Sequence, residues 1–240
     1  ILILQISSCS KKEETKYDPS GALAARLKSI TYGLTGETIS YSYTGEGKIQ
    51  LVQSSLGNKT TYEYINDSIR QTDYDKTGTL TTITTMVLDS LGLAISGTTT
   101  DANGNILGYQ ESSFDTEKHK TSELRYTATH DINGKSEWVW GGGNMYQYSV
   151  YDSAVTYKTY DSYIWYYDPA VTSFGNANTG RQFLGTDSKY LVRKIVGYTW
   201  GQANNISTFE YLFDGSHRIT QVKTYNYSGT LKSTDTYTYY

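Results

Sequence analysis

Polar and apolar side chains alternate with a period of two along most of the chain. The pattern is plain in residues 60–65, which read Thr-Thr-Tyr-Glu-Tyr-Ile, and in residues 236–239, which read Thr-Tyr-Thr-Tyr. Such alternation places successive side chains on opposite faces of a strand, and Thr, Tyr, Ile and Val favour strands. The pattern therefore predicts an all-β protein. Only residues 18–26 have a capped, proline-started helical pattern, and it allows about two turns at most.

Turn residues recur at nearly even intervals between these alternating stretches. Asp75, Asp89, Asp101 and Asp131 each begin an Asp-x-x-Gly sequence, and Asp115 falls in phase with them, giving spacings of 14, 12, 14 and 16 residues. Asp can start a turn through its side chain, and Gly supplies the positive φ that closes it. At about 14 residues per unit, residues 27–240 hold roughly 15 strands.

Connections this short join neighbouring strands, so the expected topology is one long antiparallel meander. We expect residues 27–240 to form a single repetitive β domain, curved or rolled into an open or closed barrel-like sheet. Two places interrupt the alternation. Residues 138–146 place Trp138 and Trp140 beside three consecutive glycines, and residues 169–189 show no sustained pattern, which predicts a long loop.

The first residues indicate the cellular compartment. Residues 1–8 are a short apolar run that ends in small residues, and Cys9 follows as the only cysteine. The run is too short to span a bilayer and reads as the end of a signal peptide. Together with Cys9 it resembles the bacterial lipobox, which implies that Cys9 is lipidated. Residues 9–26 are then the lipidated N-terminus and its tether, and the lipid is the only expected contact with a membrane.

Two further features resemble those of surface lipoproteins in Bacteroidetes. Residues 10–14, Ser-Lys-Lys-Glu-Glu, are similar to a short export signal, and the alternative is an ordinary solvated tether. Three Asp-Ser-apolar triplets resemble the O-glycosylation acceptor of that phylum, which would modify Ser68, Ser90 and Ser153. The alternative for the triplets is turn chemistry, because Asp and Ser are common turn residues.

The Tyr-Asp-x-x-Gly-x-Leu sequence of residues 74–80 is similar to the YD repeats of Rhs-type proteins, and residues 225–231 carry a variant of it. A lipobox followed by such a meander also resembles a Bacteroidetes lipoprotein family of unknown function with a porin-like fold. The resemblance implies a rolled antiparallel sheet and no activity. An integral membrane barrel is not expected, because threonine-rich stretches such as residues 79–85 provide no apolar outward face.

The amino-acid composition indicates which residue types fill the core. The chain has 25 Tyr, whereas Leu, Ile, Val and Phe together number 47 of 240 residues. So many aromatics with a net charge of only −3 argue against disorder. We therefore expect tyrosine to replace part of the missing aliphatic core. The acidic pI of about 5.6 excludes a strongly basic nucleic-acid-binding protein.

The sequence contains no recognisable catalytic or metal-binding motif. His119, His130 and His217 lie at or beside turns and are expected to be exposed, and no zinc ligand set is present. Residues 101–105 lack the spacing of a calcium loop, and we expect no cofactor. A pair of carboxylates brought together only by the fold, as in glycosidases, would leave no trace in the sequence.

Aromatic residues are the best candidates for a binding site. Trp138, Trp140, Tyr146 and Trp165 would provide rigid stacking surfaces for sugars; the alternative is that they pack against cross-strand neighbours. We expect a monomeric, non-enzymatic outer-membrane lipoprotein at the cell surface, which binds an extracellular glycan or protein or simply displays a β-scaffold. The alternative is a periplasm-facing lipoprotein with hydrolase or envelope-assembly activity.

Overall fold

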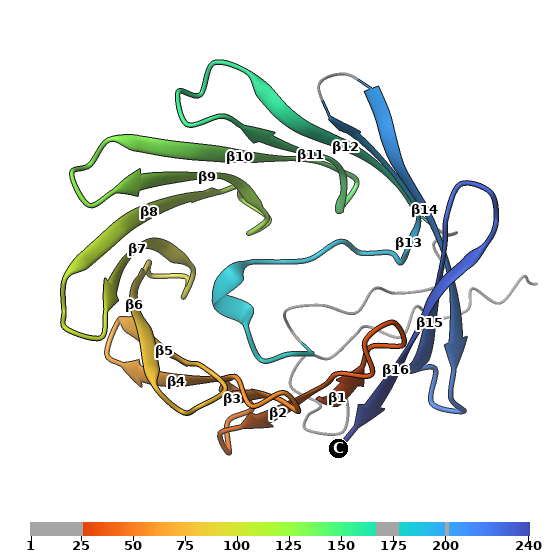
Figure 1. Ribbon diagram of the computed structural model, residues 1–240, viewed down its shortest axis with the longest axis horizontal. Coiled ribbons are helices and arrows are strands. Elements are labelled where there is room, and N and C mark those ends of the chain that lie inside the picture. The colour runs from red at the N-terminus through yellow and green to blue at the C-terminus, as the bar shows by residue number, and fades with distance from the viewer. Residues whose placement is uncertain (1–25, 167–177, 200–201) are drawn as a thin grey trace, which may run out of the picture.

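The chain folds into a closed antiparallel β-barrel of sixteen strands (Figure 1). The computed structural model describes residues 26–166, 178–199 and 202–240, so Cys9 and most of the helical pattern at residues 18–26 lie outside the described residues. Within the described residues no helix is long and apolar enough to cross a membrane. The strands are β1 (Leu27–Thr31), β2 (Thr38–Tyr43), β3 (Ile49–Ser54), β4 (Lys59–Ile65), β5 (Ser68–Tyr74), β6 (Leu80–Leu88), β7 (Ala94–Asp101), β8 (Ile106–Phe114), β9 (Lys120–Thr127), β10 (Ile132–Gly141), β11 (Asn144–Tyr151), β12 (Lys158–Tyr166), β13 (Val192–Thr199), β14 (Gln202–Phe213), β15 (Ile219–Tyr225) and β16 (Leu231–Tyr239).

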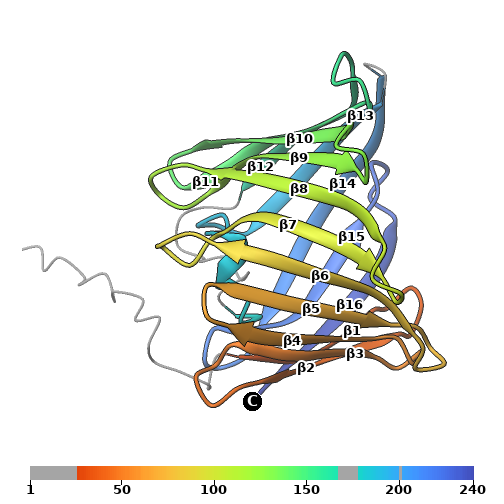
Figure 2. The same cartoon turned by 90° about the vertical axis from the view of Figure 1, so that its left-hand side faces the viewer.

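Each strand pairs with its neighbours in the chain, which confirms the predicted meander. Figure 2 shows one wall of the barrel, with the strands from β2 to β10 side by side. The sheet closes where β1 pairs with β16, in a register that sets Ser29 opposite Thr238 and Ile30 opposite Tyr237. Closure leaves no edge strand with unpaired backbone groups. The sequence left open and closed sheets as alternatives, and the structure has the closed form.

The predicted turns form through the expected side chains, with one exception. Asp75 Oδ1 accepts hydrogen bonds from the backbone N–H groups of Thr77 and Thr79, and Gly78 has a φ of 81°. The Asp131 prediction is wrong, because the turn occupies residues 127–131 and Asp131 ends it. There Thr127 Oγ1 accepts from the N–H groups of Thr129 and Asp131, and His130 takes the positive φ of 64°.

One segment without strand structure crosses the inside of the barrel. Residues 178–191, which we call the crossing segment, contain the short 3-10 helix η2 (Gln182–Leu184) and lie within the ring of strands (Figure 1). Asn178 and Gly180 accept hydrogen bonds from the N–H groups of Leu27 and Ile49, and Thr186 donates to the carbonyl of Lys118. The described part of the predicted loop is therefore held inside the barrel by hydrogen bonds to its wall.

The crossing segment lies at the end of the barrel where β1 begins and β16 ends, which we call the terminal end. Its partner Lys118 belongs to the turn between β8 and β9, and its partner Gly143 belongs to the turn between β10 and β11. In an antiparallel meander both of these turns lie at the same end as the start of β1. The segment thus spans the terminal end from one side of the wall to the other.

The strand register identifies the side chains that face the lumen. Tyr62 contacts Phe183 of the crossing segment, with ring centroids 6.2 Å apart, and therefore faces inward. Directly paired residues share a face of the sheet, so Gln71 and Thr84, which follow Tyr62 around the wall, also face inward. The residues between them in each strand face outward, among them Glu63 and Arg70, which pair with each other.

The apolar core lies inside the barrel, against β1 to β7. Its buried members are Leu27, Ile30, Tyr41, Ile49, Tyr62, Ile69, Met86, Ala94 and Phe183. Nine partly buried hydrophobic residues pack around them, and five of these are tyrosines: Tyr32, Tyr43, Tyr64, Tyr237 and Tyr239. The prediction that tyrosine supplies core material is confirmed. The rings fill the lumen on one side of the barrel rather than a layer between two sheets.

Candidate functional site

Three aromatic rings form a ladder on the lumen side of β10, β11 and β12. Trp138 pairs directly with Tyr148, and their ring centroids are 5.3 Å apart. The ring of Tyr160 lies 6.3 Å from that of Tyr148. Next to Tyr160, on β13, stands Gly197, where an added Cβ would lie 2.6 Å from the Tyr160 hydroxyl. The absence of a side chain at Gly197 therefore leaves room for the ring of Tyr160, the last ring of the ladder.

Charged side chains of β9 continue this ladder into a polar network. Lys120 Nζ lies 2.9 Å from Glu123 Oε2, and Arg125 Nη1 lies 3.2 Å from Glu123 Oε1. Arg125 also donates to Ser136 Oγ, which is 3.4 Å from the hydroxyl of Tyr148. Lys120 Nζ lies 5.7 Å from the ring centroid of Trp138. Flat rings and planar polar groups thus share one wall of the lumen.

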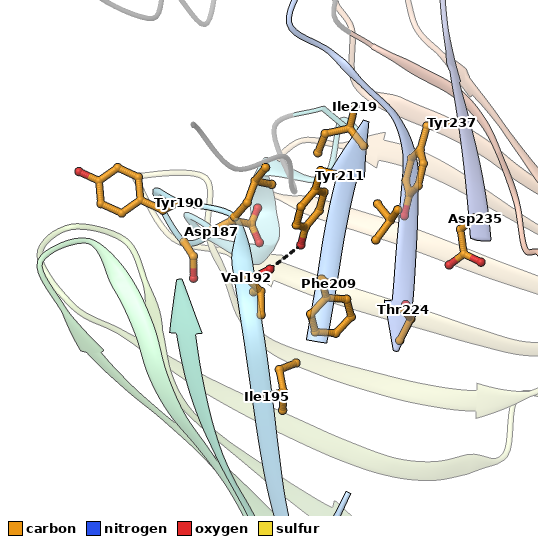
Figure 3. A pocket seen from close by; sticks show the side chains of 13 residues that line it. Asp187, Tyr190, Val192, Ile195, Phe209, Tyr211, Ile219, Thr224, Asp235 and Tyr237 are labelled. Carbon is orange, nitrogen blue, oxygen red and sulfur yellow. Dashed lines mark hydrogen bonds between the residues drawn. The ribbon is translucent and has the colours of Figure 1, made fainter. Parts of the chain in front are cut away.

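A cavity of about 380 Å³ opens on the next part of the wall, between the crossing segment and β13 to β16 (Figure 3). Its apolar lining comes from Val192, Ile195, Phe209, Tyr211, Ile219, Val222 and Leu191. Two carboxylates, Asp187 and Asp235, also line it. The hydroxyl of Tyr211 donates to the carbonyl of Val192 at 2.8 Å, which fixes this ring in the wall.

Burial raises the pKa of the lumen tyrosines further above neutral pH. Burial raises the pKa of Tyr64 and of Tyr239 to about 12. Burial likewise raises the pKa of Tyr237, and the negative charge of Asp235 raises it further. These hydroxyls therefore act as neutral hydrogen-bonding groups near pH 7, and the effect on Tyr237 shows that the charge of Asp235 reaches into the cavity.

The aromatic residues that the sequence singled out do not form one site. Trp138 faces the lumen, whereas Trp165 lies on the outer wall opposite Lys194 and is 43% exposed. Tyr146 lies at the register shift between β10 and β11, where Val139 pairs with Gln147 and Trp140 with Met145, and it is also exposed. The structure thus keeps Trp138 as a lumen candidate and separates it from Tyr146 and Trp165.

Trp140 is engaged in packing against a histidine. Its ring stacks on His119 at 4.2 Å between centroids, and its Nε1 donates to the carbonyl of Lys120. His119 is only 3% exposed, with Nδ1 lying 3.1 Å from Asp115 Oδ2, so the expectation that it is exposed was wrong. The stacked indole covers it, which the sequence did not reveal. His130 and His217 are exposed turn residues, as expected.

The three predicted O-glycosylation serines lie at or next to turns. Ser90 and Ser153 are exposed, and Ser68 is the partly exposed first residue of β5. Asp89 Oδ1 accepts from the N–H groups of Leu91 and Leu93, so turn chemistry accounts for that aspartate. Modification of these serines stays a prediction.

Sequence reasoning missed the charged residues of the lumen. Glu123 and Arg125 alternate with outward residues on β9, and Asp235 shares a face with Tyr237. Period-two alternation puts each pair on one face, which was a usable signal. Nothing in the sequence said that this face is the inner one. Asp187 gave no signal at all, because it lies in the irregular crossing segment.

Comparison with known proteins defines the fold class. The chain is similar to a porin-like protein from Bacteroides uniformis, with a TM-score of 0.68, 16% identity, and coverage of 91% of this chain and 98% of the other. It is also similar to a porin-like protein from Bacteroides vulgatus, with a TM-score of 0.58, 12% identity, and coverage of 90% and 99%. No protein-family model and no curated protein sequence matches the chain.

At these identities the likeness concerns the fold. The chain is a porin-like β-barrel of sixteen strands, and the porin-like architecture implied by the sequence resemblance is confirmed. The lipid anchor and the relation to YD repeats stay predictions.

Proposed function

We propose that this protein is a non-enzymatic envelope protein, anchored through a lipid on Cys9, that binds a glycan inside its barrel. The observation that carries the proposal is the lumen ladder of Trp138, Tyr148 and Tyr160 beside the network of Glu123 and Arg125. A sugar ring has apolar faces that stack on aromatic rings and a rim of hydroxyls that require planar polar partners. One wall of this lumen offers both.

The outer wall supports an anchor by lipid rather than by the barrel itself. A membrane barrel carries an apolar outward band. Here Glu63, Glu137, Asp161 and Glu210 each stand between two lumen-facing neighbours in the middle of the sheet, and therefore face outward. Three of them have cationic neighbours on the wall: Arg70 for Glu63, Lys135 for Glu137 and Lys158 for Asp161. Outward-facing charged residues of this kind are stable in contact with water and costly in contact with lipid.

The proposed location is the outer membrane, with the barrel facing the cell surface. The charged residues that follow Cys9 support export to that side, since they resemble the signal of surface lipoproteins. At that location the lumen would meet extracellular glycans. A periplasmic hydrolase is the rival function, and it would have to use carboxylates of the same lumen.

A glycan array tests the proposal with a matched pair of tryptophan variants. Trp138→Ala removes the first ring of the ladder, whereas Trp165→Ala removes a tryptophan from the outer wall. We expect Trp138→Ala to weaken glycan binding about tenfold or more, because stacked aromatic contacts are often worth 1 kcal/mol and upward. Trp165→Ala is expected to bind like the wild type.

Several results would contradict this function. Absence of glycan binding by the wild type, or equal binding by both variants, would remove the role of the lumen ladder. Release of cleaved products from the bound glycan would favour the hydrolase instead. Circular dichroism of both variants separates loss of binding from loss of the barrel fold.

A further inference from the structure

The cavity beside β13 to β16 has chemistry that differs from the aromatic ladder. Among the described residues that line it, the charged side chains are Asp187 and Asp235, and no Lys, Arg or His belongs to the lining. Asp187 comes from the crossing segment and Asp235 from β16, so the two carboxylates approach the cavity from different elements. In Figure 3 they lie on two sides of the wall that carries Phe209 and Tyr211.

Between the carboxylates the wall is aromatic and apolar. Phe209, Tyr211 and Tyr237 contribute rings, and Ile195, Ile219 and Val222 contribute aliphatic surface. Lys189 Nζ lies 5.1 Å from the ring centroid of Tyr190, so that ring already has a cation of the chain beside it. The volume of about 380 Å³ is within the range of small-molecule sites.

We propose that this cavity binds an organic cation, a protonated amine carried on an aromatic or branched apolar body. An ammonium group gains charge-assisted hydrogen bonds from a carboxylate, and attraction to the faces of nearby rings. The apolar body gains by leaving water for the aliphatic part of the wall. A neutral ligand of the same shape would make no charge-assisted contact with Asp235.

The fixed charge of Asp235 is the strongest electrostatic support. Its Oδ1 accepts a hydrogen bond from the N–H group of Gly33 at 3.0 Å, which holds the carboxylate in place and leaves Oδ2 for other partners. The same charge raises the pKa of the cavity residue Tyr237 beyond the effect of burial. A cation in the cavity would therefore meet a positioned negative charge. This inference does not rest on glycan binding, because it uses another part of the wall.

Matched ligands and matched variants test the proposal. The probes are 2-phenylethylamine and 2-phenylethanol, which share a body and differ in the ammonium group, and binding to the full-length protein is measured by titration calorimetry at pH 7. We expect the amine to bind at least tenfold more tightly than the alcohol. Asp235→Asn is expected to weaken amine binding about tenfold, since hydrogen bonds to charged groups are worth roughly 1.5–3 kcal/mol.

The control variant is Glu210→Gln, which removes one negative charge from the outer face of β14, next to the cavity residues Phe209 and Tyr211. It is expected to bind the amine like the wild type. Equal binding of amine and alcohol, or equal loss in Asp235→Asn and Glu210→Gln, would overturn the proposal. Absence of amine binding by the wild type would also overturn it, and leaves the glycan test on Trp138 unaffected. Thermal unfolding of each variant reports whether the barrel is intact.

Discussion

At the scale of single residues, the hydroxyl groups of two core tyrosines, Tyr43 and Tyr64, have opposite effects on the stability of the barrel. Both are partly buried on the lumen side, and burial raises the pKa of each. The hydroxyl of Tyr43 donates to the carbonyl of Leu27 at 2.6 Å, which ties β2 to the start of β1. The hydroxyl of Tyr64 is buried and has no hydrogen-bond partner among the described residues. One hydroxyl stabilises the fold, and the other costs free energy.

Replacement of each tyrosine by phenylalanine should therefore move stability in opposite directions. Tyr43→Phe is expected to lower the free energy of unfolding by about 1 kcal/mol, because the Leu27 carbonyl loses its donor. Tyr64→Phe is expected to leave it unchanged or raise it by up to about 1 kcal/mol, because an unpaired buried hydroxyl disappears. Urea denaturation followed by circular dichroism measures both. A clear destabilisation in Tyr64→Phe would mean that its hydroxyl has a partner, such as bound water.

At the scale of elements, the crossing segment fills part of the lumen and shapes the cavity that remains. It occupies the terminal end, supplies Phe183 to the core and supplies four residues to the wall of the cavity. Its docking depends on Gly180, whose carbonyl accepts from the N–H group of Ile49. Gly180 has a φ of 70°, and an added Cβ would lie 2.6 Å from Ile49 N and 2.9 Å from the carbonyl oxygen of Gly47.

Gly180→Ala should detach this part of the crossing segment from the wall. Strain at positive φ and the close backbone contact together are expected to cost about 3 kcal/mol. Hydrogen exchange of the Ile49 and Leu27 amides, which donate to residues of the segment, should become faster. Gly36→Ala is the control, because Gly36 has a φ of 71° but nothing within 4 Å of an added Cβ. If both variants exchange alike, the close approach at Gly180 is not what holds the segment.

At the scale of the whole molecule, the barrel carries charged residues on an outer wall that a membrane barrel keeps apolar. Its buried apolar residues gather inside, around Phe183, whereas its outer wall mixes serine, threonine and charged residues such as Glu63 and Arg70 with exposed apolar residues such as Trp165. Sixteen strands therefore enclose a filled core and a cavity. Under the function proposed above, we interpret this arrangement as a barrel that a lipid on Cys9, and not its own wall, holds to the membrane.

The Cys9→Ser variant tests that interpretation on the whole chain. The wild type is expected in the membrane fraction, and protease added to intact cells is expected to remove it. Cys9→Ser is expected in the aqueous fraction as a monomer without detergent, with the same β-sheet circular dichroism. A variant that remains in the membrane or needs detergent would show that the outer wall contacts lipid. Protection of the wild type from protease would place it on the periplasmic side.

Much of this architecture was predictable because the strand pattern is local. The alternation in residues 60–65 gave β4, and Asp75 with Gly78 gave the turn after β5, since both depend only on neighbouring residues. The turn at residues 127–131 was misplaced because Thr127 replaced aspartate as the capping side chain. The burial of His119 was missed because Trp140, which covers it, is 21 residues away.

The sequence by itself determined the all-β meander, the approximate number of strands and the use of tyrosine as core material. Those properties follow from period-two alternation, evenly spaced turns and composition, which need no knowledge of distant contacts. Only the tertiary structure decided that the sheet closes, which face of each strand is the inner one, and where residues 178–191 lie. Closure brings β1 to β16 across more than 200 residues, and the docking of the crossing segment brings Asp187 to the same cavity as Asp235. Alternation places a side chain on a face, but only closure makes that face a lumen.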